Sequence, residues 1–346
     1  MDAMEFAEDL SPLFLSRITD SAGNEARYMS VQTIEFTKNV QKNVAEYQLN
    51  IHYLSDQGDL YPSLRIREFG DIETLETELD GYNKFVELCE LFDDITAYSL
   101  LTVDQKKGML IFEHATGFTL DRLGISQQLR YFILGRIYGT LHGKSIEQLD
   151  DENFHRFFSF LLQHLPFTDE EKKSMLTLIE RELLKFKQNF GGFTPHVSIN
   201  PDDIIIHIND SINNLTREII SQGVNLSVSI KFERPDELAF DRMGDMADLF
   251  HDRAYSEFID SNKLIHTKYA MNEFLDGYIL ALEKLELPTL KEMYPLGTTI
   301  HLQLLFVAWL KEVEKLQIGQ LDPHTDRELL RYSYYLLTEN PFSDLI

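Results

Sequence analysis

The chain has 346 residues, enough for two domains of ordinary size or for one unit with two lobes. Its content of 43% hydrophobic and 12% aromatic residues is enough to bury a core, which argues against an intrinsically disordered chain. The formal net charge of −25 repels nucleic acid and anionic lipid, so binding to either phosphate-rich surface is excluded as the main task.

The first third of the chain has the pattern of strands around one helix. Alternating apolar and polar residues, rich in β-branched and aromatic types, predict strands. These strands are expected at 31–37, 44–53, 61–69, 97–103 and 108–114. Between the third and the fourth, apolar residues at steps of three and four predict a helix over 73–92. The polar stretch 104–107 is expected to form the turn between the last two strands.

The remainder of the chain is mostly helical in pattern. Ser126 is placed to cap a helix that runs to His142, and Thr168 with Glu171 fits a capping box at the start of another. Helical periodicity resumes near Met243 and continues to the end. Two short β-rich runs interrupt this pattern, at 204–208 and 226–232. We expect them to form a small strand pair within a helical domain.

These patterns together predict an α+β fold with two lobes. The N-terminal lobe, residues 1–114, is expected to be β-rich with one helix. The C-terminal lobe, residues 115–346, is expected to be mainly helical and to carry the short hairpin. The stretch 113–117 is the expected hinge, because it ends the last strand and precedes the helices.

The cysteine content and the length of the apolar stretches bear on the cellular compartment of the protein. Cys89 is the one cysteine, which excludes an internal disulfide and argues for a reducing compartment. It lies in an apolar pattern, so we expect a buried core residue. The first ten residues are acidic and lack a basic-then-apolar signal pattern. The longest apolar stretches are far shorter than the about 20 residues of a membrane span. We therefore expect a cytoplasmic protein.

Several short motifs resemble, in order, those of the aminoglycoside phosphotransferase and choline kinase family, which has a protein-kinase-like fold. Residues 196–206 (HVSINPDDIII) are similar to the family's catalytic loop, and 229–234 (SIKFER) to its metal-binding strand. Residues 110–117 (LIFEHATG) resemble its last small-lobe strand and hinge. Further matches lie at 134–142, 241–247 and 274–278. Their order is more specific than any single motif.

The resemblance implies phosphoryl transfer from ATP, which needs Mg²⁺ and a carboxylate that orients the attacking hydroxyl. In the loop that begins with His196, the family's catalytic Asp is replaced by Ser198, which is a poor general base. The family's metal-binding Asp is replaced by Lys231, whose ammonium has no lone pair for a metal. The family's Asn corresponds to Asp203, which with Asp202 is the remaining metal candidate.

The small lobe carries few of the family's other features. The lysine that holds phosphate in the family would fall at Arg65 or Arg67, and its helix partner at Glu78 or Glu76. The hinge position is Glu113. A solvated, charged strand and helix explains the same residues equally well. The chain contains no Gly-x-Gly-x-x-Gly loop to hold phosphates.

Two aspartates after the predicted metal-binding strand also match the family. Asp241 and Asp245 resemble the structural pair that braces the family's catalytic loop, a role that survives the loss of chemistry. If the alignment shifts by two residues, Glu233 takes the metal position instead of Lys231. If it does not, Lys231 would pair with Asp203 or hold a phosphate directly.

We therefore predict a pseudokinase that works as a binding or regulatory module without a cofactor. Its partner, a protein or a small molecule, is not indicated by the sequence. The alternative is an active phosphotransferase that uses ATP and Mg²⁺ on a small hydroxylated substrate, with a rearranged metal site. A third hypothesis is an interaction protein without a nucleotide site.

Overall fold

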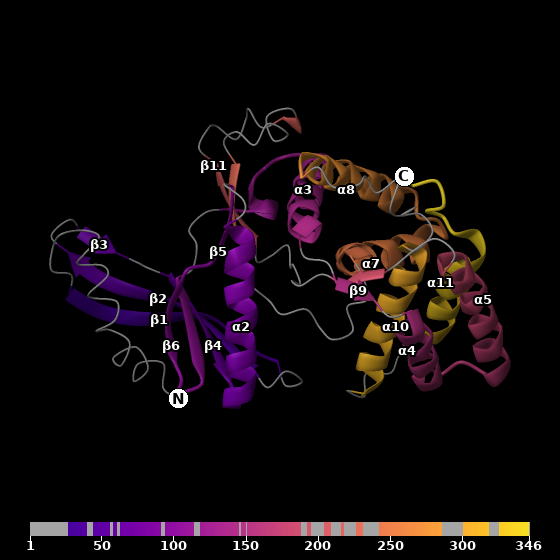
Figure 1. The fold of residues 1–346 in the computed structure, drawn as a ribbon, viewed down its shortest axis with the longest axis horizontal. Helices are drawn as coiled ribbons and strands as arrows, with labels where there is room; N and C mark the ends of the chain where they lie inside the picture. The colour runs from indigo at the N-terminus through magenta and orange to yellow at the C-terminus, as the bar shows by residue number, and fades with distance from the viewer. Residues whose placement is uncertain are drawn as a thin grey trace. The chain divides into compact units, whose positions relative to one another are not determined.

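The computed structural model describes fifteen segments of the chain. They are 27–39, 44–55, 58–60, 63–90, 94–113, 118–144, 147–149, 151–187, 192–194, 204–208, 216–217, 226–230, 242–285, 300–317 and 325–345. The chain divides into two compact units (Figure 1). The first comprises Met1–Phe118, Ile205–His207 and Ser227–Phe232, and the second comprises the rest of the chain.

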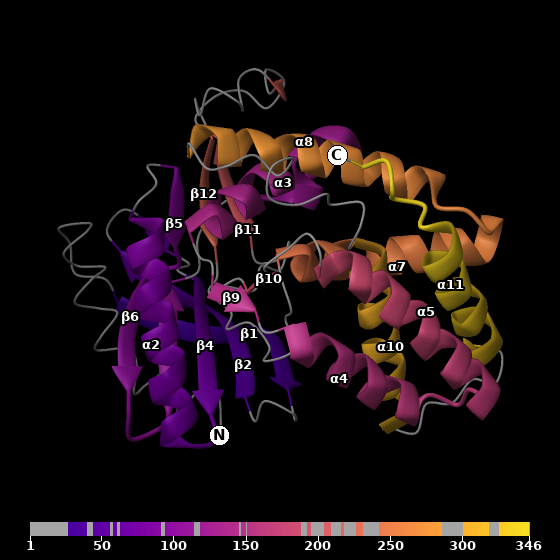
Figure 2. The ribbon, with the colours of Figure 1, turned by 45° about the vertical axis from the view of Figure 1, so that its right-hand side comes forward.

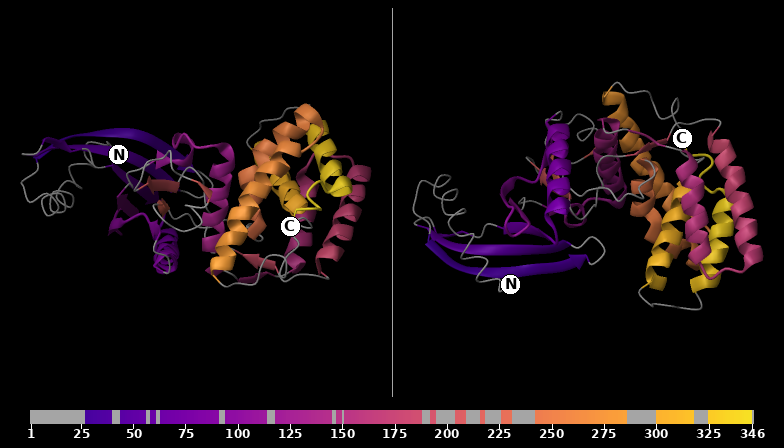
Figure 3. Two further views of the ribbon diagram at one scale, coloured as in Figure 1. Left: turned by 90° about the horizontal axis from the view of Figure 1, so that it is seen from above. Right: turned by 60° about the horizontal axis from the view of Figure 1, so that its bottom comes forward.

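The first unit is built on an antiparallel sheet with the strand order β1-β2-β4-β7-β6, and β3 pairs with β2. Its strands are β1 (Arg27–Asn39), β2 (Val44–Ser55), β3 (Gly58–Leu60), β4 (Ser63–Phe69), β6 (Leu100–Asp104) and β7 (Met109–Glu113). The long strands β1 and β2 form a curved ribbon (Figure 3). The predicted strands at 31–37, 44–53, 61–69 and 108–114 are confirmed.

Helix α2 (Ile72–Cys89) covers one face of this sheet, as Figure 2 shows. The Thr74 N–H donates a hydrogen bond of 2.7 Å to Asp71 Oδ1, which caps the helix in the way that short acidic side chains do. The Tyr82 ring packs on Phe112 of β7, with the ring centroids 5.4 Å apart. Cys89 is buried, as its apolar neighbours predicted.

The strand predicted at 97–103 is confirmed over residues 100–103, which belong to β6, but its predicted start is wrong, because the chain leaves one sheet after residue 97 and enters another at residue 100. The observed strands are β5 (Ile95–Ala97) and β6, which belong to different sheets. Between them, Tyr82 Oη donates to the Tyr98 carbonyl at 2.7 Å and accepts from the Leu100 N–H at 3.1 Å. This tyrosine therefore satisfies backbone groups that a continuous ladder would have paired.

The hairpin expected within the helical lobe also has a different place. Strands β11 (Ile204–Ile208) and β12 (Leu226–Ile230) form a second sheet with β5 and β8 (Phe118–Thr119), in the order β5-β12-β11-β8. Strand β12 runs parallel to β5, and the central residues of both hairpin strands belong to the first unit. The predicted strands themselves are confirmed.

The second unit is mainly helical, as predicted. Its helices are α3 (Gln127–Lys144), α4 (Asp151–His164), α5 (Asp169–Lys187), α7 (Arg242–Ser261), α8 (Ile265–Lys284), α10 (Ile300–Gln317) and α11 (Thr325–Glu339). A short 3-10 turn, η1 (Leu120–Arg122), and the strand pair β9 (Glu147–Leu149) and β10 (Gly192–Thr194) complete it. None of the described helices combines the length and hydropathy of a membrane span.

Both predicted helix caps are present in this unit. Ser126 Oγ accepts a hydrogen bond from the Leu129 N–H at 3.3 Å, at the start of α3. The Thr168 N–H donates to the Glu171 carboxylate at 2.8 Å, and the Glu171 N–H donates back to Thr168 Oγ1 at 3.3 Å. The hydrogen bonds that the Glu171 carboxylate accepts from the N–H and from Oγ1 of Thr168 lower the pKa of Glu171. The capping box at the start of α5 is confirmed.

Candidate functional site

Arg67 of β4 is the cation that the structure pairs with helix α2. Its side chain is 4% exposed and forms an ion pair with Glu78, which is 7% exposed. Glu78 follows Leu75 and precedes Tyr82 on the helix face that packs against the sheet. Glu76, the alternative partner, is exposed. The pairing of a strand cation with a helix carboxylate is thus present, whereas its role toward a nucleotide stays a prediction.

A second carboxylate, which the sequence did not indicate, holds the same arginine. Glu46 lies opposite Arg67 in the register of β2 and β4. Its Oε1 is 2.9 Å from Arg67 Nε, and its Oε2 is 3.6 Å from Arg65 Nη2. We call Glu46, Arg65, Arg67 and Glu78 the arginine–glutamate cluster. With two cations and two anions, its formal charge is zero.

The cluster is suited to holding anions and not to proton transfer. Guanidinium groups stay protonated at every accessible pH and present several donors in one plane. Arg67 is further held by the ring of Phe69, 5.5 Å from the guanidinium carbon. The fixed charge of Arg67 therefore serves position and electrostatics only.

The other predicted site residues are described in part or not at all. Glu113 ends β7 with an exposed side chain, and its N–H donates to the Ser99 carbonyl at 2.9 Å. Asp245 lies within α7, but its side chain is outside the described part. Also outside it are His196, Ser198, Asp202, Asp203, Lys231, Glu233 and Asp241. What these residues do stays a prediction from the sequence.

The strands that flank those residues carry a short polar ladder. Ser229 Oγ of β12 lies 2.9 Å from His207 Nε2 of β11 and 3.0 Å from Thr96 Oγ1 of β5. The isoleucines Ile204 and Ile206 are fully buried. The ladder links three neighbouring strands of the second sheet and gives its buried serine two partners. This arrangement is sufficient to explain these polar residues structurally.

Two further chemical possibilities are excluded for the described residues. Within the described ranges, no group of three or more His, Cys, Asp or Glu side chains is arranged to hold a metal ion. Desolvation by burial raises the pKa of Cys89 to about 12, so this thiol is not a nucleophile near neutral pH.

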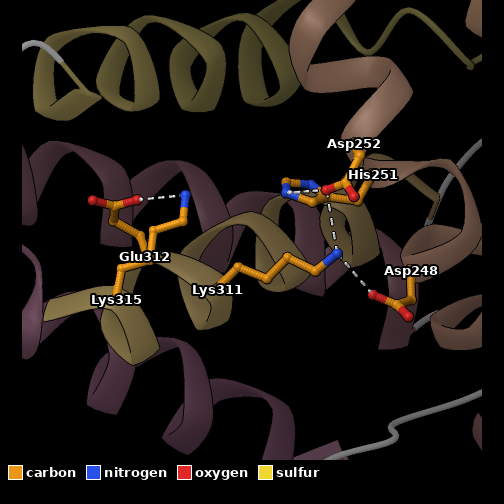
Figure 4. Close-up of polar contacts among 6 residues, drawn as sticks. All are labelled: Asp248, His251, Asp252, Lys311, Glu312 and Lys315. Carbon is orange, nitrogen blue, oxygen red and sulfur yellow. Dashed lines mark hydrogen bonds and ion pairs between the residues drawn. The ribbon is translucent and has the colours of Figure 1, made fainter. Parts of the chain in front are cut away.

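The second unit contains a cluster of charged residues on α7 and α10, drawn in Figure 4. Lys311 Nζ lies 3.2 Å from Asp248 Oδ1 and 3.3 Å from Asp252 Oδ1. His251 Nε2 lies 3.8 Å from Asp252 Oδ1, and its side chain is 8% exposed. Burial, assisted by the charge of Lys311, lowers the pKa of His251 to about 4. This histidine is therefore neutral at pH 7, and its low pKa makes it a weak base.

The geometry defines an α+β protein with a buried strand–helix ion pair in its sheet unit. Solved structures similar to this chain include choline kinase LicA from Streptococcus pneumoniae, with 12% sequence identity and a TM-score of 0.47 over 96% of this chain and 99% of that one. Another is aminoglycoside phosphotransferase APH(2")-IIa with streptomycin and ATP, with 10% identity and a TM-score of 0.49 over 97% and 98%.

A third similar structure is aminoglycoside phosphotransferase APH(2'')-Ib with ADP, with 13% identity and a TM-score of 0.45 over 97% of this chain and 99% of that one. No protein-family model matches the chain. No curated protein matches it by sequence. Because the identities are low and the TM-scores lie below 0.5, the structural similarity assigns neither an activity nor a ligand to this chain.

Proposed function

We propose that the chain is a kinase-like protein of the aminoglycoside phosphotransferase and choline kinase type with a degenerate site, which acts as a binding or regulatory module. The arginine–glutamate cluster carries this proposal. The resemblance places the phosphate-holding cation at Arg65 or Arg67. Glu46 forms ion pairs with both of these arginines, and Glu78 pairs with Arg67 as well. Active kinase-fold enzymes also have the pair with the helix glutamate, so Glu46 is the carboxylate with which a nucleotide phosphate would have to compete.

The sequence of the predicted catalytic loop supports the same proposal. Mg·ATP binding needs anionic ligands for the metal. At two of the family's three positions, this chain has Ser198 and Lys231, a neutral alcohol and a cation. An ammonium at the metal position repels Mg²⁺. We propose a protein or a small molecule as the partner, and neither nucleic acid nor an anionic membrane, because the chain carries a charge of −25.

One observation favours an active phosphotransferase as the second candidate. Kinase-fold enzymes need the ion pair between a strand cation and a helix glutamate, and the Arg67–Glu78 pair is in place. Asp202, Asp203 or Glu233 would then have to hold Mg²⁺. Among the residues that the structure describes, no group of three metal ligands is present.

Thermal unfolding of the full chain with and without Mg·ATP tests the proposal. A ligand stabilises the folded state by RT ln(1 + [L]/Kd), so bound nucleotide raises the midpoint. We expect no shift beyond that given by magnesium alone or by ATP with a chelator. A rise of several degrees that needs both magnesium and ATP would establish the active-site alternative.

A double variant tests the alignment on which the degenerate site depends. Ser198→Asp with Lys231→Asp restores both anions, and we expect Mg-dependent nucleotide binding to appear. The matched control is Lys173→Asp with Ser174→Asp, which makes the same two exchanges at exposed positions of α5. Binding in neither double variant would contradict the proposed positions of Ser198 and Lys231.

A further inference from the structure

We propose that Arg65 and Arg67 form an anion site that the chain's own Glu46 fills, and that removing this carboxylate turns it into a site for a phosphate group. This inference deepens the proposed function and rests on it, since it names how the site is kept closed to phosphate. Because Glu46 belongs to strand β2, the fold of the sheet itself keeps its carboxylate at the two arginines.

The carboxylate of Glu46 lies between two guanidinium groups and forms an ion pair with each of them. Two guanidinium groups project from alternate residues of β4, and therefore from the same face of the strand. Arg67 approaches one carboxylate oxygen at 2.9 Å and Arg65 approaches the other at 3.6 Å. Proteins bind carboxylate and phosphate oxygens with the same donors, because both present several acceptor oxygens to the planar guanidinium.

The hydrogen bonding of Arg67 leaves room for a better ligand. Its Nε is buried and has no hydrogen-bond partner among the described residues, although Glu46 Oε1 is only 2.9 Å away. The contact is therefore an ion pair in which the N–H does not point at the oxygen. A buried donor without a hydrogen bond is costly. A tetrahedral phosphate offers oxygens in more directions than the planar carboxylate that a strand holds in place.

The two glutamates of the cluster have different roles. Glu78 is 7% exposed and holds Arg67 through Nη1, so it fixes the guanidinium from the helix side. Glu46 and Arg65 are 19% and 18% exposed, so solvent reaches the cluster from their side. Replacing Glu46 changes the formal charge of the cluster from zero to +1 and leaves the Glu78 contact intact. A phosphate would then approach a net cation instead of a carboxylate.

The experiment is isothermal titration of the full chain with inorganic pyrophosphate, without metal and at low ionic strength. We expect Glu46→Gln to bind pyrophosphate with an apparent Kd at least about tenfold below that of the unmodified chain, since one repulsive charge at contact distance is removed. Adding Arg65→Gln to this variant should reverse the gain.

The matched control is Glu68→Gln. Glu68 is the neighbour of Arg67 on β4, but adjacent strand residues point to opposite faces, and Glu68 accepts a hydrogen bond from Tyr47 Oη at 2.8 Å. This variant removes the same charge and should gain no binding. An equal gain in Glu68→Gln would show a general charge effect and overturn the inference.

A second variant covers the case in which Glu46→Gln does not fold. Glu46→Thr also removes the carboxylate and suits a strand position. If neither variant folds, Glu46 is not a replaceable anion, which overturns the inference. A folded variant that binds no better than the unmodified chain also overturns it, while the proposed function stands. Tight binding of Mg·ATP to the unmodified chain would instead overturn the proposed function.

Discussion

Loss of the ion pair between Arg67 and Glu78 should strongly lower the free energy of unfolding of the first unit. Arg67→Met keeps an unbranched apolar side chain about as long as the methylene part of arginine but removes the guanidinium group. Glu78, which is 7% exposed, then stays buried without the charge that it faces, and Glu46 loses its closest cation. The variant therefore probes the site and the stability of the sheet unit together.

The expected magnitude follows from burial. Removing one partner of a buried ion pair costs about 3–5 kcal/mol, because the remaining charge stays desolvated. The contact of Arg67 with the Phe69 ring adds about 0.5–1 kcal/mol. Replacing both partners by apolar residues of similar size is often neutral. The double variant Arg67→Met/Glu78→Met should thus regain most of the stability that Arg67→Met loses.

Hydrogen exchange measured by mass spectrometry can follow the two units separately. We expect Arg67→Met to lose protection in the peptides of β4 and α2, and the double variant to recover it. Fluorescence of Trp309, the one tryptophan of the chain, reports the second unit and serves as the internal reference. If the double variant were as unstable as Arg67→Met, the desolvated carboxylate would not be the cause and the reasoning would fail.

Two predictions concern the second unit, read by Trp309 fluorescence during urea unfolding. The pKa of His251 falls from 6.5 to about 4 on folding, so the unfolded state takes up a proton first as pH falls. Through this histidine the unit should lose up to about 3 kcal/mol between pH 6.5 and 4, and His251→Gln should remove this part of the pH dependence; an equal pH dependence in the variant refutes it. An added Cβ at Gly135 would lie 1.8 Å from the Phe274 carbonyl oxygen. Gly135→Ala should therefore cost about 1–3 kcal/mol despite its better helix propensity, while exposed Asn272→Ala should not; equal effects contradict the steric cause.

The elements that could be predicted from the sequence are those determined by neighbouring residues. The alternation of apolar and polar residues predicted strands β2 and β4, and apolar residues at steps of three and four predicted helix α2. The capping box of Thr168 and Glu171 needs only residues within one helical turn, and both of its backbone bonds are present. Local patterns of this kind do not depend on the rest of the fold.

The features that were missed depend on pairing between distant segments. Alternation shows which residues share a face of a strand but not the register between two strands. Glu46 was therefore not recognised as the partner of Arg67, 21 positions away, until the register of β2 and β4 was known. The hairpin was recognised as two strands, but its place beside β5 depends on a parallel pairing that no local pattern shows.

The Arg67–Glu78 pair alone does not separate an enzyme from a binding module. It is needed for phosphate placement in one case and for the packing of α2 on the sheet in the other. Glu46 makes the difference, because an anion that already fills the accessible side of Arg67 disfavours a second anion there. A protein that worked on ATP would need to displace this carboxylate at each binding event. A protein that works by its surface can keep Glu46 in place throughout, and this favours the binding module.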